Sequence, residues 1–318
     1  MKTKKTLITL TLLVSIGLYA QPITIETVHV GNAGNAGDTR TTEEGGTFGA
    51  GAVSYDYRIG TTGVTAGQYT AFLNAVASDT GAASYITSLY NTSMSLNANG
   101  CGITRTDNGD GTYTYTAGKG DNMPVNYVNV YDAMRFCNWL TTGNTEVGVY
   151  MLNGSNIFVT RNTAAWENGG VAIASLDEWY KAAFYQGNIG LYSTYFNGKE
   201  VITTAEANFN NIVGTIADVR KYEGITASFY GVLDISGNVW EWTDTPAETE
   251  GYAYRRGGAF NNNDGILAAF SNYTSPVEIE HPYYGFRVVS LQPIPEPGTY
   301  AAIFGALALA VAVYRRRK

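Results

Sequence analysis

The sequence is poor in the side chains that most often hold transition metals. It has only two histidines, His29 and His281, and two cysteines, Cys101 and Cys137, in 318 residues. A three-histidine iron or zinc site therefore cannot be built from this chain. The cysteines are far apart and show no CxxC spacing, which excludes a four-cysteine metal cluster and a thioredoxin-type redox motif.

Charged residues are also scarce, at 15% of the chain against ~25% in an average globular protein. Glycine (37) and tyrosine (24) are plentiful, which indicates a loop-rich fold with aromatic and amide surfaces. Between the two chain ends, acidic residues outnumber basic ones, so this region carries a net negative charge. This balance disfavours nucleic acid as a partner and is compatible with cation binding.

The first twenty residues have the layout of a secretory signal peptide. A basic start with Lys2, Lys4 and Lys5 precedes an apolar run from Leu7 to Leu18, and residue 20 is a small alanine. We predict cleavage after residue 20 and export through the Sec machinery. An N-terminal membrane anchor is the alternative, for which the apolar run is short.

The last residues combine three parts in a fixed order. Pro295-Glu296-Pro297 precedes an uncharged stretch, 298–314, and then a basic cluster, Arg315, Arg316, Arg317 and Lys318. The uncharged stretch would span about 25 Å as a helix, slightly less than a ~30 Å hydrocarbon core, with the basic cluster on the cytoplasmic side.

This order resembles the PEP-CTERM sorting signal of Gram-negative bacteria, which we predict for residues 293–318. The resemblance implies transient insertion of the short transmembrane helix in the inner membrane and cleavage near Pro295 by a membrane exosortase. The body of the protein would then remain in the cell envelope, at the outer surface or in the extracellular matrix. An ordinary tail anchor is the alternative.

The region between the two ends predicts short amphipathic helices among strands and loops. Thr65, Asn129 and Ser175 each precede apolar residues at helical spacing and are expected to cap three helices. Ser175 and Glu178 have the spacing of a capping box. The alternating stretch 104–116 predicts a β-hairpin. We therefore expect one irregular α+β domain over residues 21–292.

Several stretches resemble the family of formylglycine-generating enzymes and sulfatase-modifying factors. They are SLDEWYKAAFY at 175–185, GVLDISGNVWEW at 231–242, RGGAF at 256–260 and GFRVV at 285–289, and further matches at 57–72 and 123–140 follow the family's order. The resemblance implies a fold of irregular sheets and few helices related to C-type lectins. Oxidases, non-haem iron enzymes and ligand-binding proteins share this fold, so the fold alone does not give the activity.

The cysteine pair of the oxidising family members is missing. In those members two cysteines follow a Gly-Gly-Ser segment, and their thiolates bind copper and carry the oxidation. The corresponding positions here are Asn262 and Leu267, which can neither ligate copper nor exchange a disulfide. We expect neither copper nor iron, and the interpretation leans away from an enzyme. The alternative is a formylglycine-generating-type oxidoreductase that acts on a protein cysteine.

The two cysteines present have a structural interpretation. Cys137 lies on the apolar face of its predicted helix, where a buried thiol is common. Cys101 lies in a loop rich in glycine and asparagine, so a disulfide with Cys137 is an alternative in an oxidising envelope. A relocated catalytic pair is the remaining alternative.

The resemblance also implies a calcium loop. In the family, a side-chain oxygen, two backbone carbonyls and a glutamate bind calcium at the spacing of Asp234, Gly237, Val239 and Glu241. Calcium prefers such a set of oxygen ligands. The alternative is that Glu241 and the tryptophans beside it belong to the core.

The stretch between Arg256 and Val289 is the expected ligand surface. Lectin-like relatives, including variable proteins, display their ligand contacts before a Gly-Phe-Arg ending. Amides, hydroxyls and aromatic rings suit adaptable recognition, and this stretch supplies them as Asn261, Asn262, Asn263, Asn272, Tyr273, Tyr283 and Tyr284. We predict an exported ligand-binding or structural module whose ligand is a glycan or a protein.

Overall fold

The computed structural model describes residues 23–294. The predicted signal peptide and the Pro-Glu-Pro, transmembrane and arginine parts of the predicted sorting signal lie outside these residues. Within the described part of the chain, no helix has the length and apolar character needed to cross a membrane.

Two four-stranded sheets form the centre of the domain. The first sheet is antiparallel, in the order β1-β2-β12-β5, and the second has the order β10-β9-β8-β11, with β11 parallel to β8. The strands of the first sheet are β1 (Thr27–Val30), β2 (Tyr57–Gly60), β12 (Val288–Ser290) and β5 (Ala172–Ile173). Those of the second are β10 (Tyr273–Pro276), β9 (Tyr252–Arg256), β8 (Trp240–Pro246) and β11 (Tyr284–Phe286).

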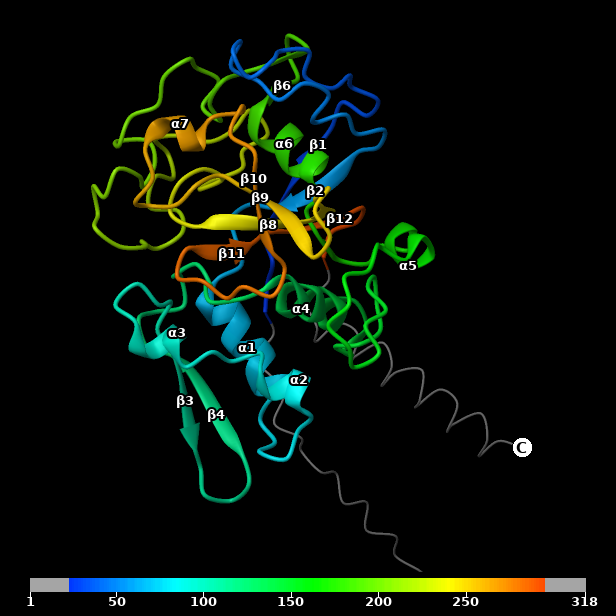
Figure 1. Cartoon of the computed structure of the whole chain (residues 1–318), viewed down its shortest axis with the longest axis vertical. Helices are drawn as coiled ribbons and strands as arrows, with labels where there is room; N and C mark the ends of the chain where they lie inside the picture. Colours follow the sequence, from blue (N-terminus) through cyan, green and yellow to red (C-terminus); the bar gives the residue numbers. More distant parts are fainter. Residues whose placement is uncertain (1–22, 295–318) are drawn as a thin grey trace, which may run out of the picture.

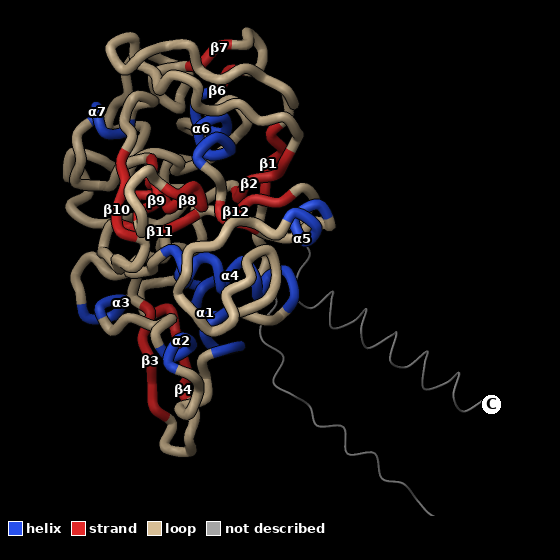
Figure 2. Tube along the Cα trace, turned by 45° about the vertical axis from the view of Figure 1, so that its right-hand side comes forward, coloured by secondary structure: helices blue, strands red, loops and turns tan. Residues whose placement is uncertain are grey.

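Three longer helices pack around the sheets. They are α1 (Ala66–Val76), α4 (Val130–Thr142) and α6 (Leu176–Phe184). Helix α6 lies on one side of the sheets, whereas α1 and α4 lie together on the other (Figures 1 and 2). The short helices are α2 (Ser84–Thr87), α3 (Ser93–Leu96), α5 (Thr163–Glu167) and α7 (Asp264–Leu267).

Two hairpins complete the domain. The larger pairs β3 (Ile103–Asp107) with β4 (Tyr113–Ala117) and projects from the end that carries α1 (Figure 1). The smaller pairs β6 (Tyr185–Gln186) with β7 (Leu191–Tyr192). The mixture of helices and strands confirms the predicted α+β class, and the larger hairpin confirms the prediction for 104–116.

The three predicted helix starts are confirmed. Thr65, Asn129 and Ser175 are the N-caps of α1, α4 and α6, and each forms a capping box with the residue three positions later. The caps satisfy backbone N–H groups that have no partner within the helix. The apolar faces then enter one core, in which Phe72, Phe136 and Trp179 have no measurable exposure.

Arg287 joins the two sheets at the point where β11 passes into β12. Its side chain is completely buried and donates to the backbone carbonyls of Gly60 and Thr61 at the end of β2, at 2.7 and 3.0 Å. It also donates to the carbonyl of Leu233 at 3.0 Å and to both carboxylate oxygens of Glu241 on β8, at 2.8 and 2.9 Å. This arginine therefore has a partner in each sheet, and its buried charge is neutralised.

Candidate functional site

Two tyrosines of the predicted ligand surface, Tyr273 and Tyr284, lie beside two residues from outside that stretch, Arg255 and Trp240. We call these four residues the Arg255 cluster. The second sheet positions it, because these residues lie on its four neighbouring strands. The Arg255 guanidinium carbon lies 4.0 Å from the ring centre of Trp240, 4.8 Å from that of Tyr284 and 5.5 Å from that of Tyr273. Such stacking stabilises a cation over aromatic faces.

One end of the Arg255 side chain has no partner. Its Nε donates to the hydroxyl of Ser275 at 2.8 Å, whereas its Nη1 is buried without a hydrogen bond among the residues that the structure describes. Burial lowers the pKa of Arg255 from its usual value. The guanidinium thus has an unused donor, and Tyr273 beside it is 40% exposed. The unused donor itself is closed off from solvent, so the part of the arrangement that is open to a ligand is the exposed ring of Tyr273.

Aromatic contacts extend the cluster toward the asparagine-rich loop. The Tyr284 ring centre lies 4.7 Å from that of His281, which lies 4.8 Å from that of Tyr283. Tyr283 in turn packs against Phe260 at 5.3 Å. Burial, followed by the nearby Arg255, lowers the pKa of His281. Ring contacts therefore connect the three predicted tyrosines, 273, 283 and 284, of which Tyr284 is buried and Tyr273 is exposed.

The predicted asparagines divide into two groups. Asn262 accepts from the backbone N–H of Ala259 at 2.8 Å, and Asn263 caps α7 by accepting from Ile266 at 3.3 Å. These two side chains hold their own loop. Asn272, beside Tyr273, is exposed, and the Oδ1 of Asn261 is buried without a partner in the described structure. Only Asn261 and Asn272 thus remain as candidate ligand contacts.

The sequence motifs did not indicate Arg255. Its only signal was a basic residue directly before the RGGAF motif that starts at Arg256, and that pattern does not distinguish the two arginines. The structure does, because Arg256 is buried and donates to the carbonyl of Ala269 at 2.8 Å and to that of Ser271. Arg255, one residue earlier, faces the aromatic rings.

The expected calcium ligands are engaged in other contacts. Both oxygens of Glu241 pair with Arg287, and one also accepts from Trp179 Nε1 at 2.7 Å. Asp234 accepts from the backbone N–H of Arg220 at 2.5 Å, and burial raises its pKa. No group of three or more metal-ligating side chains of the His, Cys, Asp or Glu types comes together in residues 23–294. In the described arrangement, the carboxylate of Glu241 is therefore occupied by Arg287 and Trp179.

The backbone gives another reason for an acidic residue at position 234. Asp234 has a φ of +51°, a left-handed conformation that asparagine and aspartate tolerate better than most residues. The interval from 234 to 239, including Gly237 and Val239, is then a turn leading into β8, and Glu241 is the second residue of that strand. Calcium binding by this loop stays a prediction.

The two cysteines are free and fully buried. The described structure therefore has no disulfide between them: Cys137 packs on the inner face of α4, and Cys101 lies in the core before β3. Burial raises the pKa of both thiols, that of Cys137 strongly. A thiol of this kind is inert, because the thiolate is the reactive form. The buried-thiol interpretation of Cys137 agrees with the structure.

Two irregular sheets flanked by a few capped helices define an α+β domain with long connecting loops. Residues 27–291 match the family described as sulfatase-modifying factor enzyme 1-like domain. The match covers most of the chain, so the chain belongs to this family.

Solved structures share the fold. A crystal structure of CarF has a TM-score of 0.56 and 22% identity, covering 84% of this chain and 98% of that one. Treponema denticola variable protein 1 has a TM-score of 0.55 and 19% identity, covering 86% and 99%. PvdO from Pseudomonas aeruginosa has a TM-score of 0.51 and 16% identity, covering 85% and 93%. No curated protein matches the chain.

Proposed function

We propose that this protein is an exported ligand-binding or structural module rather than a cysteine-dependent oxidase. The observation that carries the proposal is the lack of an accessible thiol in the described domain. Asn262 holds a turn, Leu267 is 1% exposed in the core, and both cysteines are buried. A copper–thiolate reaction needs sulfur at the surface of the site.

A first experiment tests the oxidase alternative directly. The purified protein is incubated with copper, oxygen and a cysteine-containing sulfatase peptide, and the peptide mass is followed. We expect no conversion of cysteine to formylglycine. Turnover that persists after copper reconstitution of a highly purified sample would overturn the proposal.

The Arg255 cluster is the proposed ligand surface. The exposed ring and hydroxyl of Tyr273, stacked beside the Arg255 guanidinium, suit a glycan or protein ligand that presents oxygen atoms. The proposed relation to C-type lectins, and the variable protein among the structures of similar fold, support a recognition role for this stretch. The identity of that relative is too low to transfer its ligand.

A second experiment tests this surface. A screen of glycans and envelope proteins should yield a ligand whose binding falls about tenfold or more in Arg255→Met, because truncated arginines are frequent binding hot spots. Lys221→Met removes an exposed positive charge elsewhere and serves as the matched control. Equal losses in both variants would indicate general electrostatics instead of a site.

The proposed location follows from the two chain ends. Sec export, transient insertion in the inner membrane and exosortase cleavage would leave the domain in the envelope, at the outer surface or in the matrix. Mass spectrometry of native material should show a chain that starts near Gln21 and ends near Pro295. Recovery of an intact Lys318 terminus would contradict this processing.

A further inference from the structure

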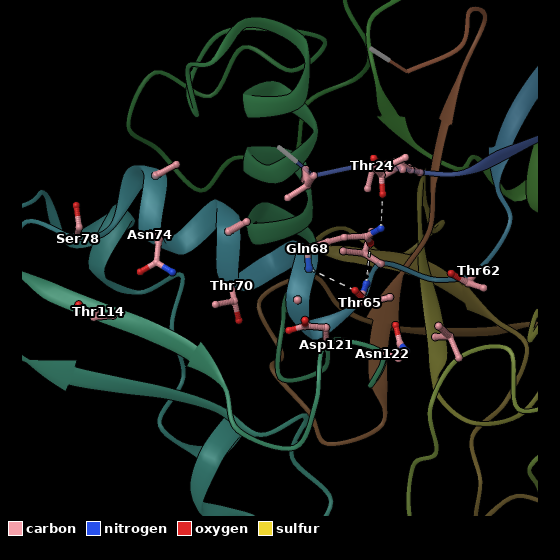
Figure 3. A pocket seen from close by; sticks show the side chains of 18 of the residues that line it. Thr24, Thr62, Thr65, Gln68, Thr70, Asn74, Ser78, Thr114, Asp121 and Asn122 are labelled. Carbon is pink, nitrogen blue, oxygen red and sulfur yellow. Dashed lines mark hydrogen bonds between the residues drawn. The ribbon is translucent and has the colours of Figure 1, made fainter. Parts of the chain in front are cut away.

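A groove of about 1390 Å³ lies outside the Arg255 cluster, between α1, the β3–β4 hairpin and the segment 23–26 (Figure 3). Pockets that hold one small ligand measure ~300–1,000 Å³. The groove is therefore large enough for an extended ligand.

The outward face of α1 forms one side of the groove. It carries Gly67, Thr70, Ala71, Asn74 and Ala75, with Ser78 just beyond the helix. The eleven residues of α1 include no charged side chain, although the solvent face of an amphipathic helix is usually charged. This face is thus an open trough of small and neutral polar groups.

Hydrogen bonds fix the two walls against α1. Asn74 bonds both backbone groups of Tyr115 on β4, donating to the carbonyl and accepting from the N–H, each at 2.9 Å. On the other side, Gln68 donates to the backbone carbonyl of Thr24 at 2.9 Å, as Figure 3 shows. The groove is therefore formed before any ligand arrives, which reduces the ordering cost of binding.

Neutral polar side chains are the most numerous kind in the lining. Six threonines, one serine and four amide side chains contribute to it, together with Tyr113. Thr70 is 9% exposed, and its hydroxyl has no hydrogen-bond partner among the described residues. Such a hydroxyl is rare in a folded protein, because leaving a buried polar group unpaired is costly.

Peptides and charged polymers suit this lining less well. Its isoleucines and valines are all at most 8% exposed, so Tyr113 is the one large apolar side chain in the lining that a peptide side chain could contact. Of its four charged residues, Glu26 and Arg220 pair with each other, and Asp110 accepts from the backbone and hydroxyl of Thr112 at 3.0 and 2.6 Å. Only Asp121 remains as a charge without a hydrogen-bonded or ionic partner in the described structure.

We infer that this groove binds a linear neutral oligosaccharide. Sugar hydroxyls donate and accept hydrogen bonds, as do the threonine, serine and amide groups that line it. The elongated trough along α1 suits a chain of several sugar rings. This site is separate from the proposed ligand surface, and either can exist without the other.

The test uses calorimetry with linear hexasaccharides of glucose (β-1,4 and α-1,4), mannose and N-acetylglucosamine. We expect at least one to bind the purified protein in the micromolar to millimolar range. Ala75→Arg should weaken this binding at least tenfold, because the exposed Ala75 lies in the trough and arginine would fill it. Ser78→Arg places the same obstacle near the end of the trough and should act likewise.

Controls separate blocking from general effects. Ala164→Arg adds the same side chain to an exposed position of α5, outside the groove, and should leave binding unchanged. Arg255→Met should also leave it unchanged, so failure of this inference and failure of the proposed function are distinguishable. Melting temperatures confirm that each variant folds. Absence of binding to all four sugars, binding that both groove variants retain, or binding only to acidic oligosaccharides or peptides would overturn the inference.

Discussion

Replacing Glu241 by glutamine tests whether the buried contact with Arg287 holds the two sheets together. The side chains of Glu241 and Arg287 are 3% and 0% exposed, and their closest atoms are 2.8 Å apart. Glutamine keeps the shape of the side chain but removes the charge, so the arginine would remain buried without a counter-ion. Removing one partner of a buried pair costs about 3–5 kcal/mol.

The expected effect is large enough to measure by thermal unfolding. For a domain of this size, each kcal/mol lowers the melting temperature by roughly 2–4 °C, so Glu241→Gln should melt roughly 6–20 °C below the wild type. Circular dichroism of the purified protein gives the measurement. Lys199→Gln is the control, because it breaks an ion pair in which Lys199 is 62% exposed. Such pairs contribute about 1 kcal/mol or less.

The same experiment decides between the ion pair and the predicted calcium ligand. If Arg287 is the partner of Glu241, the wild type should have the same melting temperature in calcium and in EDTA. The variant should then have a lower melting temperature than the wild type under both conditions. A wild-type melting temperature that rises with calcium, and a variant that differs from it only when calcium is present, would refute the ion-pair argument. That outcome would establish Glu241 as a ligand.

Three further changes test other parts of the structure. Burial, and then the nearby Glu280, raise the pKa of Asp132 to about 8, so its contribution to stability is complete below pH ~4 and is lost as the pH rises to about 8. The free energy of unfolding of Asp132→Asn should therefore fall less over this range than that of the wild type, and identical slopes in denaturant titrations would contradict the argument. Thr70→Val removes an unpaired buried hydroxyl and should leave the melting temperature equal or higher, whereas a clear fall would show that the hydroxyl is satisfied. Ser175→Ala removes the cap that accepts from the Glu178 N–H at 3.2 Å and should lower the free energy of unfolding in urea by ~1 kcal/mol. Ser175→Gly should lower it much less, because glycine is tolerated at an N-cap. Equal losses in the two variants would show that capping is not the cause.

Local sequence signals predicted the elements that depend on neighbouring residues. A capping side chain and the residue three positions later lie within one turn, so Thr65, Asn129 and Ser175 indicated their helices. The hairpin was predictable for the same reason. These signals depend on the chain immediately around them and need no knowledge of the rest of the fold.

Contacts between distant segments were not predictable in this way. The sequence around Glu241 is compatible with a calcium loop and with an ion pair to Arg287. Only the pairing of β8 with β11, which brings Arg287 to Glu241, shows which partner it has. Composition likewise cannot tell an asparagine that holds its own loop, as Asn262 does, from one that faces a ligand. The groove along α1 depends on three separate segments, and none of them carries a motif that indicates a binding site.

The pairing of the last strands determines when the domain can fold. Strand β12 lies between β2 and β5, with Val289 opposite Ile59 on one side and Ala172 on the other, and β11 completes the second sheet. Neither sheet can therefore be completed while a growing chain still lacks its final segment. The edges of the early strands therefore stay unpaired until the last strands have been synthesised. Pairings between such distant residues also slow folding. A protein with this strand order benefits from a chaperone that binds the incomplete chain until β11 and β12 are available.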